Sequence, residues 1–539
     1  MNRVFKCKYD ITSGVTKVVS ELANNQQLTS QCQASSSISS SFSLPFRFTL
    51  LVLGLGMVNE GGANQNVYSW TDNQFKIGEW NKCGGSNSVQ LSDNWNDCSN
   101  SDYVAIGKNA TVGVVSLKND EKSGMVAIGS NSNALGAKAI ALGMLAKTKE
   151  GAGQAIAIGN NAGANSQSVA LGADVYALGK SSVAIGNDDI DDSRFDDKLP
   201  INEINTIFKK LKDDNSYFGT YNNRFEQLYV TGSSNGKQVD NRKYSPTYAA
   251  GVGAIAIGSR TVAAGDLSTS VGALSFALAD YSTTLGMRSF VARSAKGGVA
   301  VGQESRVFAA NSLSIGNFNE ATSNGSMSYG YNAKAVGEHT IAIGSIVAAG
   351  AKFDPTTGQQ WLDLYKSFNK NSTDLDSNDE FDTKATTILK NGNTNGSETM
   401  PLTYDSETIL TIGGKDIKKI KPHGETGAGK NAIVIGGRSF ALWENSLALG
   451  YSALADASNG FAIGSYAYAG NRATNAMAIG VRSYAEGVNS IALGYRARVQ
   501  DESKNTEFLK SISADKNQDS YKGTNSIALG IESLAYLNN

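Results

Sequence analysis

The chain is poor in the residue types on which several functional classes depend. It has 539 residues with only 6 prolines, 2 histidines and 4 cysteines, and its formal net charge is −1. A balance so close to neutral offers no electrostatic footprint for a polyanion and argues against nucleic acid as a partner. Aromatic residues make up 8% of the chain, whereas glycine occurs 58 times. This composition favours an elongated repeat over a string of ordinary globular cores.

The scarcity of histidine also limits the chemistry that the chain could carry. A Ser/His/Asp or Cys/His constellation, or a histidine-rich zinc site, would need His339 or His423. One lies within a repeat and the other in an insertion, so both are interpreted as polar surface residues. We therefore predict a non-enzymatic protein with no catalytic residues, no cofactor and no metal site.

Two segments resemble ligand-binding loops, but we interpret both as loops without a ligand. "GETGAGKN" at 424–431 fits a phosphate-binding loop, but Asn431 stands where a Ser or Thr would contact magnesium and a repeat strand follows. We interpret it as a flexible return to the repeats. The acidic run at 188–197 lacks the ligand-and-glycine spacing of a known calcium loop, which favours a solvated loop.

An apolar triplet that ends in glycine, such as "VAIG" or "IALG", recurs along the chain mostly every 14 residues. A near-fixed period of this kind is the signature of a solenoid. We call the glycine that ends each triplet the anchor glycine. The anchor glycines are Gly107, Gly129, Gly143, Gly159, Gly172, Gly186, Gly258, Gly272, Gly286, Gly302, Gly316, Gly330, Gly344, Gly436, Gly450, Gly464, Gly480, Gly494 and Gly530.

Each triplet predicts a strand with bulky residues on one face and a methyl group on the other, as in Ile255-Ala256-Ile257. Small residues such as Ala453 and Ala455, three and five past the glycine, leave room for a second short strand. Such a coil is a flattened roll that admits only small side chains inside. The bulky face would then form a continuous apolar ribbon, which identical chains around an axis could bury. The candidate interface residues are Ile255, Ile257, Ile341, Ile343, Ile491 and Leu493.

Residues 1–61 are predicted to direct export. The apolar run 48–58 has the length of a signal-peptide core and is too short to span a bilayer. We assign 1–61 to an extended signal peptide and 62–100 to an N-terminal segment. In that segment Cys83 and Cys98 could close one disulfide loop in an oxidising compartment, or remain unpaired thiols.

Two long insertions, 187–248 and 351–428, interrupt the repeats and look like versions of one module, with a third, short insertion at 500–522. Apolar residues at helical spacing predict a short amphipathic helix in both long insertions. Their aromatic residues are candidates for ligand contact, since binding surfaces use aromatics and adaptable loops. The alternative is that these rings pack the helix onto the roll or onto a neighbouring chain. The helical faces are Ile201, Ile204, Phe208 and Leu211 in the first insertion and Trp361, Leu364, Tyr365 and Phe368 in the second; the candidate contacts are Tyr217, Phe218, Tyr221, Phe225, Tyr229, Trp361 and Tyr365.

The N-terminal phrase "VVSELA" at 18–23 and the repeat phrase "AEGVNSIALGYRARV" resemble trimeric autotransporter adhesins of the Yersinia adhesin type. The resemblance covers the head repeats at 101–186, 249–350 and 429–539. It implies an all-β solenoid, a left-handed parallel β-roll of about 14-residue repeats assembled as a homotrimer, with small α-containing insertions. It also implies export to the surface and outer membrane of a Gram-negative cell, and binding to host extracellular matrix proteins or cell receptors, or self-aggregation.

The sequence leaves two other functions open. The protein could be a structural spacer of a surface fibre. It could also be a hexapeptide-repeat acyltransferase, but the 14-residue period of this chain, its leader and its lack of a well-placed histidine all argue against that class of enzyme.

The resemblance has one departure. The family continues into a coiled-coil stalk and a membrane anchor, whereas "NSIALGIESLAYLNN" follows a head repeat directly. We find no sustained heptads and no series of anchor strands. The sequence is expected to be a fragment, a truncated product, or a head whose anchor is encoded elsewhere.

Overall fold

The computed structural model describes most of the repeat region and part of the insertions. The described residues are 5–10, 15–20, 69–71, 74–76, 89–91, 103–113, 124–187, 233–234, 237–238, 246–370, 377–390, 400–412, 415–422, 429–470, 474–500 and 525–536. The chain divides into two units, Met1–Tyr68 and Ser69–Asn539. In the first unit, β1 (Phe5–Asp10) pairs antiparallel with β2 (Val15–Ser20).

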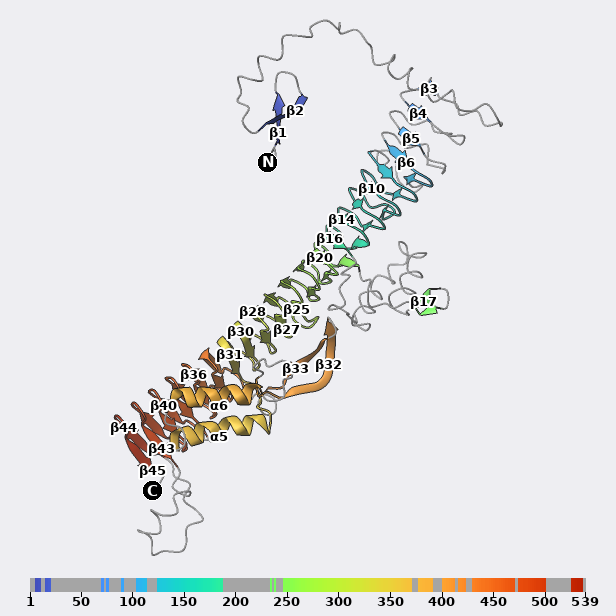
Figure 1. The fold of residues 1–539 in the computed structure, drawn as a ribbon. Coiled ribbons are helices and arrows are strands. Elements are labelled where there is room, and N and C mark those ends of the chain that lie inside the picture. Colours follow the sequence, from blue (N-terminus) through green and yellow to red (C-terminus); the bar gives the residue numbers. More distant parts are fainter. Residues whose placement is uncertain are drawn as a thin grey trace, which may run out of the picture. The chain divides into compact units, whose positions relative to one another are not determined.

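The second unit is a parallel β-solenoid whose coils follow the anchor glycines (Figure 1). Each coil has a first strand that carries the apolar triplet, and most coils have a second, shorter strand that begins three to four residues past the glycine. The first strands are β5 (Val89–Leu91), β6 (Val104–Ile106), β8 (Val126–Ile128), β10 (Ile140–Leu142), β12 (Ile156–Ile158), β14 (Val169–Leu171), β16 (Val183–Asn187), β20 (Ile255–Ser259), β22 (Thr269–Val271), β24 (Thr283–Leu285), β26 (Val299–Val301), β28 (Leu313–Asn317), β34 (Ile433–Gly437), β36 (Leu447–Leu449), β38 (Phe461–Ile463), β40 (Met477–Ile479), β42 (Ile491–Leu493) and β44 (Ile527–Leu529).

The second strands stack in a parallel layer of their own. They are β7 (Thr111–Val112), β9 (Asn133–Ala134), β11 (Lys147–Thr148), β13 (Gly163–Ala164), β15 (Val175–Ala177), β19 (Thr247–Ala249), β21 (Val262–Ala263), β23 (Phe276–Ala277), β25 (Phe290–Val291), β27 (Arg306–Val307), β29 (Glu320–Ala321), β35 (Phe440–Ala441), β37 (Leu454–Ala455), β39 (Tyr468–Ala469), β41 (Tyr484–Ala485), β43 (Arg498–Gln500) and β45 (Leu534–Tyr536). In two coils one long strand spans both positions, β30 (Met327–Ala335) and β31 (Ile341–Ala349). The short strands β3 (Ser69–Thr71) and β4 (Gln74–Lys76) join the N-terminal end of the sheet, and β17 (Ser233–Ser234) pairs with β18 (Lys237–Gln238).

Equivalent residues of successive coils lie directly over one another. Ala256 pairs with Ser270 and Ile257 with Val271, for example, and the register continues across both insertions: Ala184 pairs with Ala256, and Ala342 with Val434. The spacing between paired strands is about 4.8 Å. The prediction of a parallel solenoid with a period near 14 residues is therefore confirmed.

The division of each first strand into an inner and an outer face is also as predicted. Ala256 is 0% exposed inside the roll, whereas its neighbours Ile255 and Ile257 are 36% and 37% exposed on the outside. The same alternation holds at Ala492 and Leu493, which are 0% and 40% exposed. Most inner side chains between the two strand layers are Ala, Ser or Thr because the roll is flat, and valine also fits, as at Val434, which is 0% exposed.

The turn after the first strand requires glycine. At Gly344 φ is +138°, and a Cβ atom there would lie 1.5 Å from the carbonyl oxygen of Gly436 in the next coil. No L side chain fits this conformation and this distance together. Glycine therefore recurs in the sequence because the same close approach between neighbouring coils recurs along the roll.

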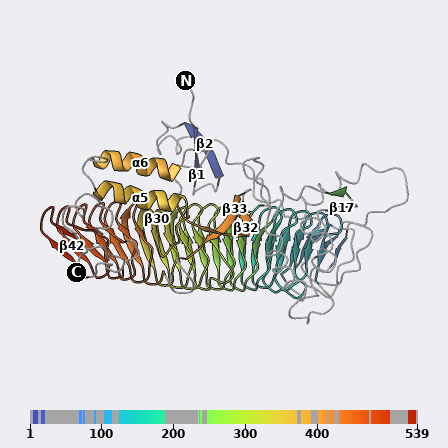
Figure 2. The same cartoon turned by 90° about the horizontal axis from the view of Figure 1, so that it is seen from below.

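The second insertion forms a module on the roll. It contains the helices α5 (Thr357–Lys370) and α6 (Asn378–Lys390) and the antiparallel hairpin of β32 (Tyr404–Ile412) and β33 (Lys415–Ile420). These are the two helices of the described residues, and both run alongside the C-terminal coils (Figures 1 and 2). We call α5 and α6 the helical module.

Candidate interaction surfaces of the roll

The outer side chains of the first strands form one continuous surface, which we call the apolar ribbon. It consists of the residues three and one before each anchor glycine. Nearly all of them are Ile, Val, Leu, Met or Phe, with Thr269, Thr283 and Tyr329 as the polar members. Many are half-exposed in the single chain: Leu142 is 39%, Leu171 42%, Leu285 49% and Leu449 39% exposed.

All six predicted interface residues lie on this ribbon. Ile255 and Ile257 belong to β20, Ile341 and Ile343 to β31, and Ile491 and Leu493 to β42. The structure therefore brings them to one side of the roll, aligned through 14-residue steps along the stack. Each side chain is on the outer face of its strand, with a buried alanine between the two members of the pair.

The interior of the roll changes from alanine to hydroxyl residues in its middle part. Ser270, Ser275, Thr284 and Ser289 are 0% exposed. Their hydroxyls are joined by hydrogen bonds of 2.7–3.0 Å, including Ser275 to Thr284 and Ser275 to Ser289. Burying a hydroxyl costs little when its hydrogen bonds are made, so these coils remain closed without alanine at every inner position.

The helical module packs its apolar face onto the second strands. Trp361 and Tyr365 of α5 are 0% exposed, and the Tyr365 hydroxyl donates a hydrogen bond to the carbonyl oxygen of Ser452. The ring of Tyr365 stacks on Tyr468 of β39 at 5.7 Å between centroids. Burial raises the pKa of the Tyr365 hydroxyl well above its ordinary value. The predicted helical face of α5 is therefore real, and it faces the roll.

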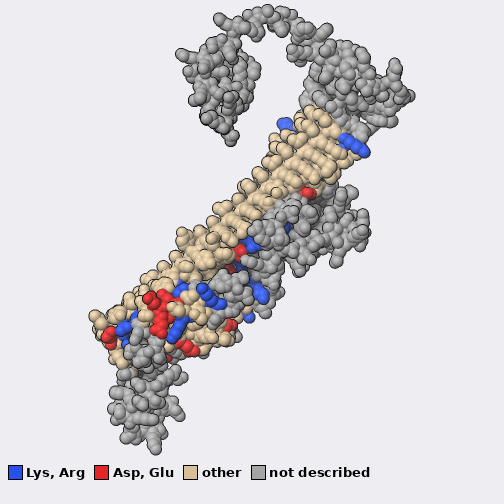
Figure 3. Space-filling model, in the orientation of Figure 1, with Lys and Arg blue, Asp and Glu red and all other residues tan. Residues whose placement is uncertain are grey.

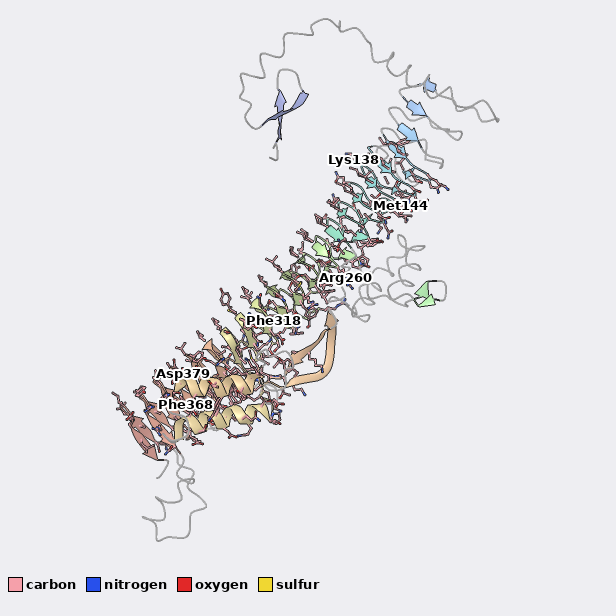
Figure 4. The ribbon with its side chains drawn as sticks, viewed as in Figure 1. Lys138, Met144, Arg260, Phe318, Phe368 and Asp379 are labelled. Carbon is pink, nitrogen blue, oxygen red and sulfur yellow. The ribbon has the colours of Figure 1, made fainter. Side chains whose placement is uncertain are left out.

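Polar contacts hold the ends of the module. Asp354 caps α5 by accepting from the amides of Thr356 and Thr357 at 3.0 and 2.9 Å, and the Thr357 amide is the main reason that the pKa of this carboxyl is lowered. Arg482 of the roll donates to the Asn378 side chain at 2.7 Å and lies over the ring of Phe368, 4.3 Å from its centroid. Figure 4 labels Phe368 and Asp379 on the two helices. The module is thus fixed at both helices.

The outer face of the module is charged. Asp379, Glu380, Lys384 and Lys390 of α6 are exposed, and Lys384 forms only a long surface contact with Glu380, 3.9 Å between Nζ and Oε1. Figure 3 shows charged side chains gathered over this part of the molecule, whereas the stretch of roll N-terminal to it has few on the same face. The helical module therefore places charged side chains over a part of the roll whose own side chains at that place are apolar.

A buried ionic network crosses the second strands between the two insertions. Glu320 accepts from Arg306 at 3.3 Å and from Lys334 at 3.1 Å, and Glu304 bridges Arg306 to Arg288 at 3.4 and 3.2 Å. Burial lowers the pKa of Lys334, and the neighbouring Glu320 opposes that shift. Sequence reasoning missed this network, although the 14-residue spacing of Arg306, Glu320 and Lys334 was visible.

A ladder of asparagines runs along one edge of the C-terminal coils. Each Nδ2 donates to the Oδ1 of the asparagine in the next coil at 2.8–3.0 Å. All have φ between 53° and 67°, a conformation that asparagine tolerates better than most residues. The ladder consists of Asn431, Asn445, Asn459, Asn475, Asn489 and Asn525.

The remaining predicted site residues divide into two groups. Trp361 and Tyr365 pack α5 onto the roll, which is the alternative raised from the sequence, and they offer no surface to a ligand. The others lie outside the described residues: Tyr217, Phe218, Tyr221, Phe225, Tyr229, Cys83, Cys98, His423 and the acidic run 188–197.

The described residues hold little that could support catalysis or metal binding. They contain no group of three or more His, Cys, Asp or Glu side chains placed to share a metal ion. His339 is exposed at a turn with φ +54°. After Lys430 and Asn431 the chain enters strand β34, with no helix to present a phosphate-binding N-terminus. No helix within the described ranges is long and apolar enough to cross a bilayer.

Comparison with known families identifies the YadA head domain repeat, whose model holds two copies of the repeat. It matches residues 126–146, 165–188, 249–275, 294–319, 321–345, 444–467 and 473–497. Each matched segment contains two successive anchor glycines, so the model follows the coils of the structure. No curated protein matches the chain. The coils between residues 126 and 497 therefore carry head repeats of the YadA type, which supports a YadA-like trimeric autotransporter adhesin head.

Proposed function

We propose that this protein is the ligand-binding head of a bacterial surface adhesin, and that it works as a homotrimer. Three rolls would bury their apolar ribbons against one another and carry the inserted modules on the outside. The observation that supports this most strongly is the ribbon itself, which runs through every described coil from β6 to β44. Monomeric proteins rarely expose a contiguous apolar surface of such extent.

A charge placed in the ribbon tests the assembly. Ile257→Asp and Ile343→Asp would each bring three carboxylates into the proposed interface, and burying them unpaired is costly. We expect both variants to lose the trimer. Val252→Asp is the matched control, because Val252 is 51% exposed in a turn outside the ribbon. Intact trimers of both ribbon variants, measured by light scattering, would place the interface elsewhere.

The proposed ligands are host extracellular matrix proteins or cell receptors, with self-aggregation as a related activity. The contact surface that we propose consists of the charged outer face of α6 and the first insertion, 187–248, with its aromatic residues Tyr217, Phe218, Tyr221, Phe225 and Tyr229. Support comes from the family, and from the gathering of charge on the helical module. The roll is the scaffold that holds both insertions, and we propose no enzymatic activity.

We also propose the route of the protein to the surface. Residues 1–61 would direct export, Cys83 and Cys98 would form a disulfide after export, and a stalk and anchor outside this sequence would retain the head at the outer membrane. Mass spectrometry of the exported protein without reductant tests the first two points, since it reports the new N-terminus and the loss of two hydrogens.

Charge reversal on the helical module tests the binding. Reversing Asp379, Glu380, Lys384 and Lys390 changes the outer face of α6 and leaves its buried face intact. We expect weaker binding to cultured human cells or to purified matrix proteins at an unchanged trimer mass. Exchanging Lys138 and Glu150 for residues of opposite charge on the N-terminal coils is the control. If the α6 variant and a variant without 190–244 both bind fully, the contact surface lies on the roll. If the wild-type head binds none of these probes, the spacer function is favoured.

A further inference from the structure

The second strands carry two apolar patches at equivalent places, and each patch follows a long insertion. The position concerned is four residues past the anchor glycine, or its equivalent in β19, where the side chain faces outward. After the second insertion it holds Phe440, Leu454, Tyr468 and Tyr484, which we call the covered patch; after the first insertion it holds Tyr248, Val262, Phe276 and Phe290, which we call the first patch.

Elsewhere this position is mostly polar, charged or small; the apolar exceptions are Tyr176, in the coil before the first insertion, and Leu534, in the last described coil. It is Thr111, Asn133 and Lys147 in the N-terminal coils, and Arg306, Glu320 and Lys334 between the two patches. An apolar residue at this position thus occurs in four consecutive coils after each insertion and stops at a charged residue. The first run is extended by Tyr176 on the other side of its insertion, where the ring stacks on Tyr248 at 5.8 Å between centroids, whereas Ala348 precedes the second run.

The covered patch shows why these residues are apolar. All four of its side chains are 0% exposed, and they form one cluster with Trp361, Tyr365 and Phe381 of the helical module. Without a cover the position is open, as at Leu534 in the last described coil, which is 46% exposed.

The first patch is buried to nearly the same extent. Tyr248 is 7%, Val262 4%, Phe276 2% and Phe290 0% exposed. Yet, among the residues that the structure describes, the members of their cluster all belong to the roll and none to a helix. Side chains on the outer face of a flat roll cannot hide one another completely, so a further segment must cover them.

We propose that the first insertion covers this patch with an amphipathic helix, as α5 and α6 cover theirs. The insertion leaves the roll after Asn187 and returns at Thr247, at the first coil of the patch. The apolar residues from Ile201 to Leu211 follow Pro200 at helical spacing, as Trp361 to Phe368 follow Pro355 in the second insertion. This assignment is independent of the ligand proposed above.

The dimensions fit. An α-helix from Ile201 to Leu211 has ten steps between its first and last residue and spans about 15 Å at about 1.5 Å per step. Four coils spaced about 4.8 Å apart span about 14 Å between the first and the last. One helix of this length along the roll axis would therefore reach every side chain of the first patch.

Limited trypsin digestion of the full chain tests the proposal. The first insertion contains many lysines and arginines between Arg194 and Lys243. In the double variant Phe276→Glu, Phe290→Glu we expect cleavage there to accelerate at least about tenfold, the effect of losing one large apolar contact on a local opening. The roll should accept these substitutions, because Glu320 occupies the same repeat position.

Two matched variants complete the experiment. Leu454→Glu with Tyr468→Glu should accelerate cleavage in the second insertion and leave the first unchanged. Phe208→Asp with Leu211→Asp should reproduce the effect of the Phe276 and Phe290 pair from the other side, and it remains informative if the roll variant fails to fold. Unchanged cleavage between 194 and 243 in both the roll and the segment variants would overturn the proposal. Unchanged cleavage with a reduced mass in light scattering would also overturn it, and would show that a second copy covers the patch.

Discussion

The substitution Gly344→Ala tests the close approach that defines each coil. A Cβ atom at this residue would meet the carbonyl oxygen of Gly436 at 1.5 Å, whereas real Cβ contacts are essentially never under 3.0 Å. To restore a contact of 3.0 Å, these two atoms of neighbouring coils would have to move apart by about 1.5 Å. The two coils meet where β31 pairs with β34, across the second insertion; β31 is labelled in Figure 1.

The cost follows from two contributions. A non-glycine residue at φ +138° is strained, which costs about 1–3 kcal/mol. Separating the coils by 1 Å or more would also break the hydrogen bond from the Arg438 amide to the Ser345 carbonyl, now 2.9 Å, and weaken its neighbours, at about 1 kcal/mol each. Together we expect a local destabilisation of about 3–5 kcal/mol.

Hydrogen–deuterium exchange is the assay, because solenoids open locally and seldom unfold in a single step. Amides of β31 and β34 should exchange at least about a hundredfold faster in Gly344→Ala, since about 1.4 kcal/mol corresponds to a factor of ten. Gly530→Ala is the control: Gly530 has φ +115° at the same repeat position, but no atom lies within 4 Å of its added Cβ. Its effect should be smaller and confined to the last coil. Wild-type exchange rates in β31 and β34 of Gly344→Ala would refute the reasoning.

Three further substitutions test other features of the roll. Asn459→Ala should destabilise the C-terminal coils by about 1–3 kcal/mol, because it removes two ladder hydrogen bonds at φ +53°; Asn459→Gly, which keeps the conformation, should cost less, and equal melting temperatures for the two would contradict this. Glu320→Gln should lower the free energy of unfolding by about 3–5 kcal/mol, because it leaves Lys334 and Arg306 without their carboxylate partner. The double variant Glu320→Leu, Lys334→Met should recover part of this stability. A double variant less stable than the single one would argue against the network. Tyr365→Phe should cost about 1 kcal/mol at pH 7 and flatten the loss of stability above pH 10. The sign follows because the pKa of Tyr365 is raised on folding: the unfolded chain loses this proton first, so rising pH favours unfolding, and an unchanged pH dependence in chemical denaturation would show that Tyr365 does not contribute.

The repeat was predictable because one physical constraint recurs with one period. The close approach at the anchor glycine and the methyl-sized interior leave a mark in every coil, so the inner face at Ala256 and the outer face at Ile257 could both be assigned from the sequence. The helical face of α5 in the second insertion was predictable for the same reason, since Trp361, Leu364 and Phe368 follow the period of a helix.

What such a face contacts could not be predicted from the face alone. Trp361 and Tyr365 look the same in sequence whether they meet a ligand or the roll, because only the outward position of the second strands distinguishes the two. Reading that position coil by coil would have shown Phe440 and Tyr468 as the partners. The same reading would have shown the charges of Arg306, Glu320 and Lys334, which pair only because the coils place residues 14 apart side by side.

The solution molar mass of residues 62–539, measured by light scattering after size exclusion, tests the central claim most directly. The claim is that the apolar ribbon is buried by threefold self-assembly. A mass of three chains that falls to one in Ile257→Asp, and stays at three in Val252→Asp, is the result that we predict. If the wild-type fragment is a monomer, a trimeric coiled coil from another protein can be fused at its C-terminus and then cleaved off. A fragment that is still monomeric after this treatment would show that the ribbon does not hold chains together, and would contradict the account.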